Sequence, residues 1–260
     1  MPHRISFWTK LHNVFQKLWF FFLETLFPWF CLGCHKEVTN FPICSDCLSK
    51  IPIAYNFICP ICGKNVLLSK TIINSKLTIE KVSNCSHHLS LTALGAATDY
   101  SNELVRELIF AFKYNKIVAL KTPLSQLIIS FLERTNWSTL LDLNWLVIPI
   151  PLHRRKYQLR GFNQSELLAQ VVAQYFSLEI SNKPLVRIKN NQAQASLKDK
   201  HSRLENAKGI FTISKPQIVH NRNILLIDDV ITTGATMLEA AKILKGNKAR
   251  QIIGLVLAKG

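Results

Sequence analysis

Two glycine-rich phosphate-binding motifs are missing from this chain of 260 residues, which contains only 9 glycines. It has no loop that ends in Gly-Lys-Ser/Thr, as in nucleoside-triphosphate hydrolases, and no Gly-x-Gly-x-x-Gly fingerprint of dinucleotide-binding proteins. Both kinds of nucleotide site are therefore excluded as explanations of the strand, loop and helix pattern near the carboxyl end.

Acidic residues are also scarce. The chain has 16 aspartates and glutamates against 32 lysines and arginines, so its formal net charge is +16. This excess favours a partner that carries phosphate, either a nucleotide or a nucleic acid, although a basic protein with a solvated positive face would have the same composition. Hydrophobic residues make up 48% of the chain, which supports a packed core and argues against disorder.

An apolar run near the amino terminus, residues 18–30, lacks the features of an exported or membrane-spanning segment. It is shorter than the roughly 20 residues that a helix needs to cross a bilayer. It also contains Glu24 and Pro28, and no small-x-small cleavage site follows it. We expect a short helix packed against the body of a cytoplasmic, not secreted, protein, with peripheral membrane contact as the alternative.

Seven cysteines are present, and six of them form C-x-x-C pairs, which fit metal sites in a reducing cytoplasm better than disulfides. Each pair can place two thiolates on one small turn, and two turns complete a tetrahedral sulfur site with no open position. Redox-active or merely buried cysteines are the alternative. We predict a structural zinc ion held by Cys31, Cys34, Cys44 and Cys47.

A second set of candidate zinc ligands follows. Three thiolates and one imidazole would complete another four-ligand site, made of Cys59, Cys62, Cys85 and His88. His87 could serve in place of His88, or the site could stay unformed, because exposed histidines are common. The polar and β-branched residues between these pairs, 64–81, predict a long hairpin or loop.

From residue 91 the pattern alternates between strands and helices, with strands expected at 93–98, 145–150, 224–227 and 251–257. This alternation predicts an α/β fold, in which helices cover both faces of a parallel sheet. We expect three helices here: one capped by Ser101 or Asn102, one that begins at Pro123, and one capped by Ser165. The chain then has two parts: 1–90, an apolar helix with a double zinc-ribbon-like module, and 91–260, the α/β domain.

The most informative run extends from Ile224 to Met237. Four aliphatic residues predict a buried parallel strand, and two carboxylates, Asp228 and Asp229, follow at its carboxyl end, where ligands of open α/β sheets bind. The next loop can turn backbone N–H groups and threonine hydroxyls toward a phosphate at the positive end of a helix. Its residues are Thr232, Thr233, Gly234, Ala235 and Thr236.

Two adjacent carboxylates repel each other, so a partner is expected, either sugar hydroxyls or a divalent cation. A phosphate cradle beside acceptors for a diol describes a ribose 5-phosphate site. An ordinary strand-turn-helix junction with a polar turn is the alternative. Acids that turn inward to pair with lysines would contradict the sugar site.

A second constellation lies on a strand-to-helix connection, residues 148–164. Four fixed cations within seven residues can meet a multiply charged anion, and guanidinium groups can bind phosphate oxygens in bidentate fashion. A solvated basic loop is the alternative. A third polar stretch, 187–209, is either a loop that closes over a substrate or an ordinary surface connection. The anion-binding candidates are Arg154, Arg155 and Arg160.

The run from Ile224 to Met237 resembles the 5-phosphoribosyl 1-diphosphate (PRPP) signature of type I phosphoribosyltransferases. With the stretch Arg160-Gly161-Phe162-Asn163-Gln164, the chain is similar to the ComF group of that superfamily, which is associated with bacterial competence. The resemblance implies a type I phosphoribosyltransferase fold with a small zinc module, and a site for PRPP with Mg²⁺. Asp228 and Asp229 would be catalytic residues that face the ribose 2- and 3-hydroxyls, residues 232–236 would hold the 5-phosphate, and the three arginines would hold pyrophosphate.

Two functions stay open. A phosphoribosyltransferase would need an acceptor, for which the residues indicate neither a recognition pocket nor a general base. A nucleotide-responsive protein would recognise PRPP or a related nucleotide with the same pocket. Its zinc and basic surfaces would then engage single-stranded DNA and other competence or DNA-uptake proteins. A zinc scaffold with no ligand pocket is the third class.

Overall fold

The computed structural model describes residues 29–73, 76–82, 85, 87, 90–137, 144–189 and 207–260. The chain forms two compact units, one that ends at Lys50 and one from Ile51 to Gly260. The units divide there because strands between residues 57 and 82 join the sheet of the second unit. The division of the sequence into a module of residues 1–90 and a domain of residues 91–260 stays a prediction.

The first unit is small. Strand β1 (Trp29–Phe30) pairs antiparallel with β2 (Glu37–Val38), and helix α2 (Ser45–Ser49) follows. The N-cap of α2 is Cys44, whose Sγ accepts a hydrogen bond from the backbone N–H of Cys47 at 3.3 Å. The turn after β1 and the start of α2 therefore carry the first set of cysteines.

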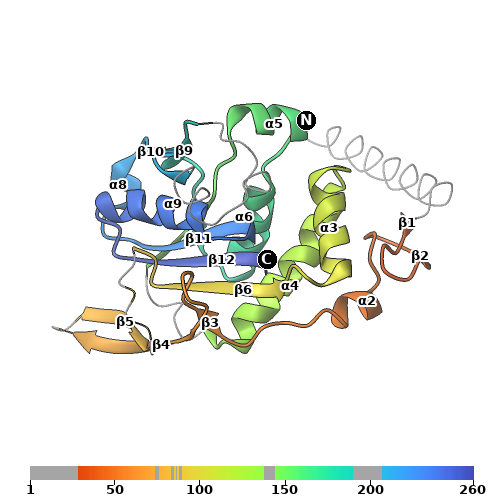
Figure 1. Ribbon diagram of the computed structural model, residues 1–260, viewed down its shortest axis with the longest axis horizontal. Helices are drawn as coiled ribbons and strands as arrows, with labels where there is room; N and C mark the ends of the chain where they lie inside the picture. The colour runs from red at the N-terminus through yellow and green to blue at the C-terminus, as the bar shows by residue number, and fades with distance from the viewer. Residues whose placement is uncertain are drawn as a thin grey trace, which may run out of the picture. The chain divides into compact units, whose positions relative to one another are not determined.

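One eight-stranded sheet organises the second unit (Figure 1). Its order is β5-β4-β3-β6-β12-β11-β7-β8. The five strands from β6 to β8 are parallel, whereas β3, β4 and β5 pair antiparallel with their neighbours. The bounds are β3 (Phe57–Ile58), β4 (Asn65–Ile73), β5 (Lys76–Val82), β6 (Ala93–Asp99), β7 (Trp145–Pro149), β8 (Glu179–Ile180), β11 (Asn223–Ile231) and β12 (Gln251–Lys259).

Helices connect the parallel strands, and β9 (Leu185–Arg187) pairs antiparallel with β10 (Phe211–Ile213). The helices are α3 (Glu103–Lys113), η1 (Val118–Leu120), α4 (Lys121–Arg134), α5 (Arg154–Arg160), α6 (Gln164–Tyr175), α8 (Pro216–Val219) and α9 (Ala235–Gly246).

Both faces of the sheet are packed, as two glycines on adjacent strands demonstrate. A Cβ on Gly254 of β12 would lie 3.2 Å from Met237 Cγ of α9. A Cβ on Gly95 of β6 would lie only 2.5 Å from Phe131 Cε1 of α4. Gly254 is in register with Leu94, and Gly95 is in register with Leu255. Because successive residues of a strand point to opposite faces, the two glycines also point to opposite faces of the sheet. The predicted α/β fold with a parallel sheet and flanking helices is confirmed.

The helix starts agree with the prediction in part. Asn102 caps α3 by accepting a hydrogen bond from Val105 N–H at 3.1 Å. Helix α4 begins at Lys121 instead of Pro123, because the turn η1 leads directly into it. Asn163, and not Ser165, caps α6, since the Ser165 hydroxyl has a different partner. The polar stretch 64–81 forms the hairpin of β4 and β5.

No helix of the described residues is long and apolar enough to cross a membrane. The apolar run 18–30, expected to form a helix, lies outside the described residues apart from Trp29 and Phe30, which form β1.

Candidate functional site

The paired acids lie inside β11, not after it as the sequence suggested. Pairing of β11 with β7 stops at Ile227, whereas pairing with β12 continues to Ile231. Asp228 and Asp229 therefore occupy the part of β11 that extends beyond the end of β7. This open step at the carboxyl ends of the parallel strands is the position where ligands of such sheets bind.

Asp228 is held by two hydrogen-bond donors through one oxygen. Ser165 Oγ, at the start of α6, donates to Asp228 Oδ1 at 2.7 Å, and the backbone N–H of Asp229 donates to the same oxygen at 2.9 Å. Burial and the neighbouring charge of Asp229 nevertheless raise the pKa of Asp228 from 3.8 to about 6. The hydrogen bonds from Ser165 and the Asp229 amide, and the charge of Lys113, lower this pKa and so offset only part of the cost of burying the carboxylate.

Asp229 is 8% exposed and has a cationic partner that the sequence did not indicate. Lys113 Nζ, at the end of α3, lies 2.8 Å from Asp229 Oδ1, and both side chains are largely buried. Sugar hydroxyls or a divalent cation were the expected partners, but Asp229 pairs with a buried lysine, the arrangement that counts against a sugar site at this acid. Asp228 forms its closest contacts with Ser165 and the Asp229 amide instead.

Three further cations interact electrostatically with the acids or with one another. Burial and the charges of Arg187 and Arg160 lower the pKa of Lys156, which also interacts with Asp229 and Lys113. Burial lowers the pKa of Arg187, while Asp228 opposes this shift. Lys113, Lys156, Arg160 and Arg187 thus come from α3, α5 and β9 to one place.

Of the three predicted anion-binding arginines, the structure brings only Arg160 into this cluster. Arg160 is half-buried and donates to Gln164 Oε1 at 2.9 Å, and its guanidinium lies 5.4 Å from the centre of the Tyr114 ring. Arg154 and Arg155 are exposed on the first turn of α5. Lys156 lies one helical turn before Arg160, so both lie on the same face of α5.

The stretch from Arg160 to Ser165 sets the path of the chain around this cluster. Gly161 ends α5 with φ of +84°, in the left-handed region that glycine tolerates. Asn163 Nδ2 then donates to the carbonyl oxygen of Ile150 at 3.0 Å, which ties the start of α6 to the end of β7. The motif positions Ser165 beside Asp228.

The loop after β11 leads into α9 as predicted. Gly234 is the N-cap with φ of +81°, and it has no side chain that could cap the helix. Thr233 Oγ1 accepts from Ala235 N–H at 3.4 Å. Thr233, Gly234 and Ala235 are buried, Thr232 is exposed and Thr236 is half-buried. The helix amino terminus thus offers positive potential beside the acids, which suits a phosphate.

The first set of cysteines converges in the first unit. The Sγ atoms of Cys31 and Cys34 lie 3.7 Å and 3.8 Å from that of Cys44, and Cys47 completes a group whose ligand atoms are all within 4.8 Å of one another. Sulfurs around a tetrahedral zinc ion with bonds of about 2.3 Å are about 3.8 Å apart, so the donor set fits zinc.

The second set also converges. Cys59, Cys62, Cys85 and His87 place their ligand atoms within 4.8 Å of one another, with Cys59 Sγ at 3.8 Å from His87 Nδ1. Three sulfurs and one imidazole nitrogen again suit zinc. The fourth ligand of this group is His87, which the sequence offered as the alternative to His88. His88, the ligand predicted first, lies outside the described residues.

We expect two zinc ions per purified chain, measured by atomic emission. His87→Ala is expected to lower this number to one, because it removes a ligand of the second group. The matched variant His88→Ala is expected to retain two. A loss of zinc in His88→Ala with none in His87→Ala would reverse the assignment.

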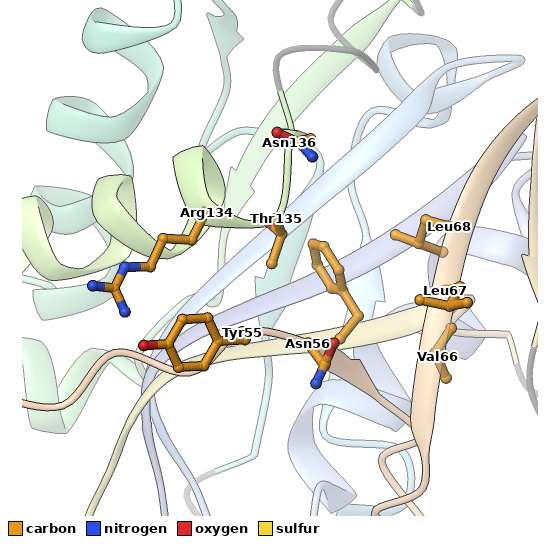
Figure 2. Close-up of a pocket in the computed structure, with 9 residues that line it drawn as sticks. Tyr55, Asn56, Val66, Leu67, Leu68, Arg134, Thr135 and Asn136 are labelled. Carbon is orange, nitrogen blue, oxygen red and sulfur yellow. The ribbon is translucent and has the colours of Figure 1, made fainter.

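A hollow of about 410 Å³ lies elsewhere in the second unit (Figure 2). Arg134, at the end of α4, stacks 4.8 Å from the centre of the exposed Tyr55 ring, and Leu67 and Leu68 of β4 form the facing wall. The hollow shares no residue with the acids or the loop of α9, so it contributes nothing to their chemistry.

Comparisons with known proteins agree with this geometry. The profile of the double zinc ribbon domain matches residues 22–85, and that of the phosphoribosyl transferase domain matches residues 163–260. Competence protein ComFC of Bacillus subtilis is 30% identical over 222 residues, which cover 84% of each chain. Competence protein F of Haemophilus influenzae is 27% identical over 232 residues, 88% of this chain and 90% of that protein. DNA utilization protein YhgH of Escherichia coli strain K12 is 30% identical over 159 residues, 61% of this chain and 68% of that protein.

Proposed function

Since this chain belongs to the ComF family, we propose that it binds PRPP with Mg²⁺ in the cytoplasm and acts as a phosphoribosyltransferase. The observation that carries the proposal is the meeting of three elements at one sheet edge. These are the acids of β11, the amino terminus of α9 and the cluster of Lys113, Lys156, Arg160 and Arg187. A ribose that carries phosphate at C5 and pyrophosphate at C1 needs these three types of partner.

In this proposal the loop Thr232–Thr236 holds the 5-phosphate, and the acids accept hydrogen bonds from the ribose 2- and 3-hydroxyls. The bonds found for the acids use Oδ1 of each carboxylate, so Oδ2 is the oxygen assigned to the hydroxyls. Lys113 then neutralises Asp229 while the diol binds, instead of excluding the sugar.

Transfer requires the C1–O bond to pyrophosphate to break as an acceptor atom forms a bond to C1. Lys156, Arg160 and Arg187 stabilise the negative charge that collects on pyrophosphate. Asp228 and Asp229 stabilise the positive charge that develops on the ribose. Bound Mg²⁺ would supply further neutralisation of the pyrophosphate oxygens.

A second candidate function is a non-catalytic competence protein that binds single-stranded DNA in response to a nucleotide. Two observations favour it: the net charge of +16, and the names of the similar proteins, which refer to competence and DNA utilization. The exposed Arg154, Arg155 and Tyr157 on α5 offer cations and an aromatic ring of the kind that contacts single strands.

Calorimetric titration with PRPP and Mg²⁺ tests the pocket that both functions share. We expect heat of binding with wild-type protein and none with the double variant Asp228→Asn, Asp229→Asn, whose surface charges elsewhere are unchanged. Release of pyrophosphate in the presence of candidate acceptors then identifies the enzyme. Binding of PRPP together with salt-dependent retention of single-stranded DNA, but without pyrophosphate release, identifies the second function. Absence of heat with wild-type protein contradicts the pocket itself.

A further inference from the structure

The second metal group lies against the loop that is assigned to the 5-phosphate. The Cys59–Cys62 turn begins directly after β3. A Cβ on Gly234 would lie 3.6 Å from the carbonyl oxygen of Pro60 and 3.7 Å from Pro60 Cβ. Pro60 therefore packs on the side of Gly234 where any other residue would carry its side chain.

A second contact continues this junction. A Cβ on Gly63 would lie 3.7 Å from Lys259 Nζ, at the end of β12. Lys259 is the register partner of Ile231, the last residue of β11 before the loop. The Cys59–Gly63 turn thus spans both the loop and the strand beside it.

Backbone bonds of the described residues hold this turn at its two ends. Ile58 pairs with Leu94 of β6, Cys59 N–H donates to Lys64 O at 2.8 Å, and Gly63 N–H donates to Cys59 O at 2.9 Å. The other two ligands, Cys85 and His87, come from beyond the hairpin of β4 and β5. A metal bound to all four would fix the turn, and Pro60 with it, against the α9 loop.

We propose that Pro60 is a positioning residue for the phosphate loop, and that metal in the second group sets the affinity of this loop for a sugar phosphate. This inference rests on the proposed function, because it concerns the 5-phosphate end of the same site. The turn contacts the loop at Gly234 and β12 at Lys259, whereas the pyrophosphate cations come from α3, α5 and β9.

The coupling must be reciprocal. If metal raises the affinity for sugar phosphate, then sugar phosphate must raise the affinity of the second group for metal by the same factor. The first group lies in the other compact unit, so its metal provides a matched control.

The binding experiment uses the full chain and two ligands. Pro60→Gly retains all four metal ligands but removes the ring beside Gly234. We expect about tenfold weaker binding of ribose 5-phosphate, measured by calorimetry, with unchanged zinc content and unchanged binding of Mg²⁺-pyrophosphate. A variant that merely destabilised the fold would weaken the binding of ribose 5-phosphate and of Mg²⁺-pyrophosphate together. Cys62→Ser, which loses the second zinc ion, is expected to show the same selective loss, whereas Cys34→Ser is expected to behave as wild type.

A spectroscopic experiment tests the reverse direction. Cobalt(II) loaded into Cys34→Ser protein occupies the second group and gives a thiolate-to-cobalt absorption band. We expect ribose 5-phosphate to shift this band and to slow removal of cobalt by a chelator, and ribose without phosphate to do neither.

Three results would overturn the inference, and they differ in what else they affect. Equal ribose 5-phosphate affinity in wild type, Pro60→Gly and Cys62→Ser would refute the coupling and leave the proposed function intact. Failure of wild-type protein to bind ribose 5-phosphate or PRPP at all would refute both. Parallel loss of sugar phosphate and pyrophosphate binding in Pro60→Gly would assign Pro60 to the fold alone.

Discussion

Asp228→Asn is expected to make the free protein more stable at neutral pH while it weakens ribose 5-phosphate binding about 100-fold. The carboxylate is costly in the folded chain, because its pKa is raised from 3.8 to about 6. A shift of about two pH units corresponds to roughly 3 kcal/mol, and we expect the neutral amide to recover about 2 kcal/mol of it. Binding suffers because a hydrogen bond to a charged acceptor contributes roughly 1.5–3 kcal/mol.

The pH dependence of this effect has a definite sign. A raised pKa means that the folded protein binds the proton more tightly than the unfolded chain does. The stabilisation by that proton is complete below pH 3.8 and is lost as the pH rises through about 6. Asp228→Asn should therefore equal wild type in unfolding free energy at acid pH and exceed it above about pH 6.

Urea denaturation at a series of pH values measures this difference, and calorimetry at the same pH values measures ligand affinity. Wild-type affinity for ribose 5-phosphate should fall as the pH drops through about 6, since the neutral acid is a poorer acceptor. Glu133→Gln, which removes an exposed carboxylate bound to Tyr175, provides the control. It should change neither the pH dependence of the unfolding free energy nor that of the affinity for ribose 5-phosphate. A destabilised Asp228→Asn protein at pH 8 would contradict the assigned environment.

Lys113→Met is expected to destabilise the protein by about 3 kcal/mol, because it leaves Asp229 as a buried charge without its ion-pair partner. Adding Asp229→Asn should restore much of this loss, since the double variant buries no unpaired carboxylate at that position. Chemical denaturation of the wild type, the two single variants and the double variant gives the coupling energy of the pair.

The control for this cycle lies on the same helix. Arg106 and Glu103 form a solvent-exposed pair at 3.8 Å, so Arg106→Met should change the free energy of unfolding by no more than about 0.5 kcal/mol. Additive losses in the Lys113 and Asp229 cycle would show that the contact at 2.8 Å carries no net interaction.

The fold and the strand-loop-helix core of the site could be predicted from the sequence because their determinants are local. Four aliphatic residues, two acids, a hydroxyl-rich loop and a helix occur in one run, and C-x-x-C pairs place their thiolates on single turns. Alternation after residue 91 was likewise sufficient for the parallel sheet.

Arg160 was among the predicted cations, but the rest of the cationic side of the site could not be predicted, because it depends on contacts between distant segments. Lys113 is the last residue of α3 and Arg187 the last residue of β9, and folding alone brings them near the acids. Lys156 is distinguished from the exposed residues beside it only by the face of α5 on which it lies. Ser165 was assigned to a helix cap, since its position in the sequence gives no sign of Asp228. His87 and His88 were adjacent candidates that spacing alone could not separate.

Two helices, α6 and α9, begin beside the same pair of acids: Ser165 is the second residue of α6 and contacts Asp228, and α9 begins four residues after Ile231. The amino terminus of each helix carries a partial positive charge from its peptide dipoles. Because this part of the electric field arises from the main chain, replacement of any single side chain leaves it in place. A variant of this chain with its lysines and arginines replaced would therefore keep this part of the positive potential.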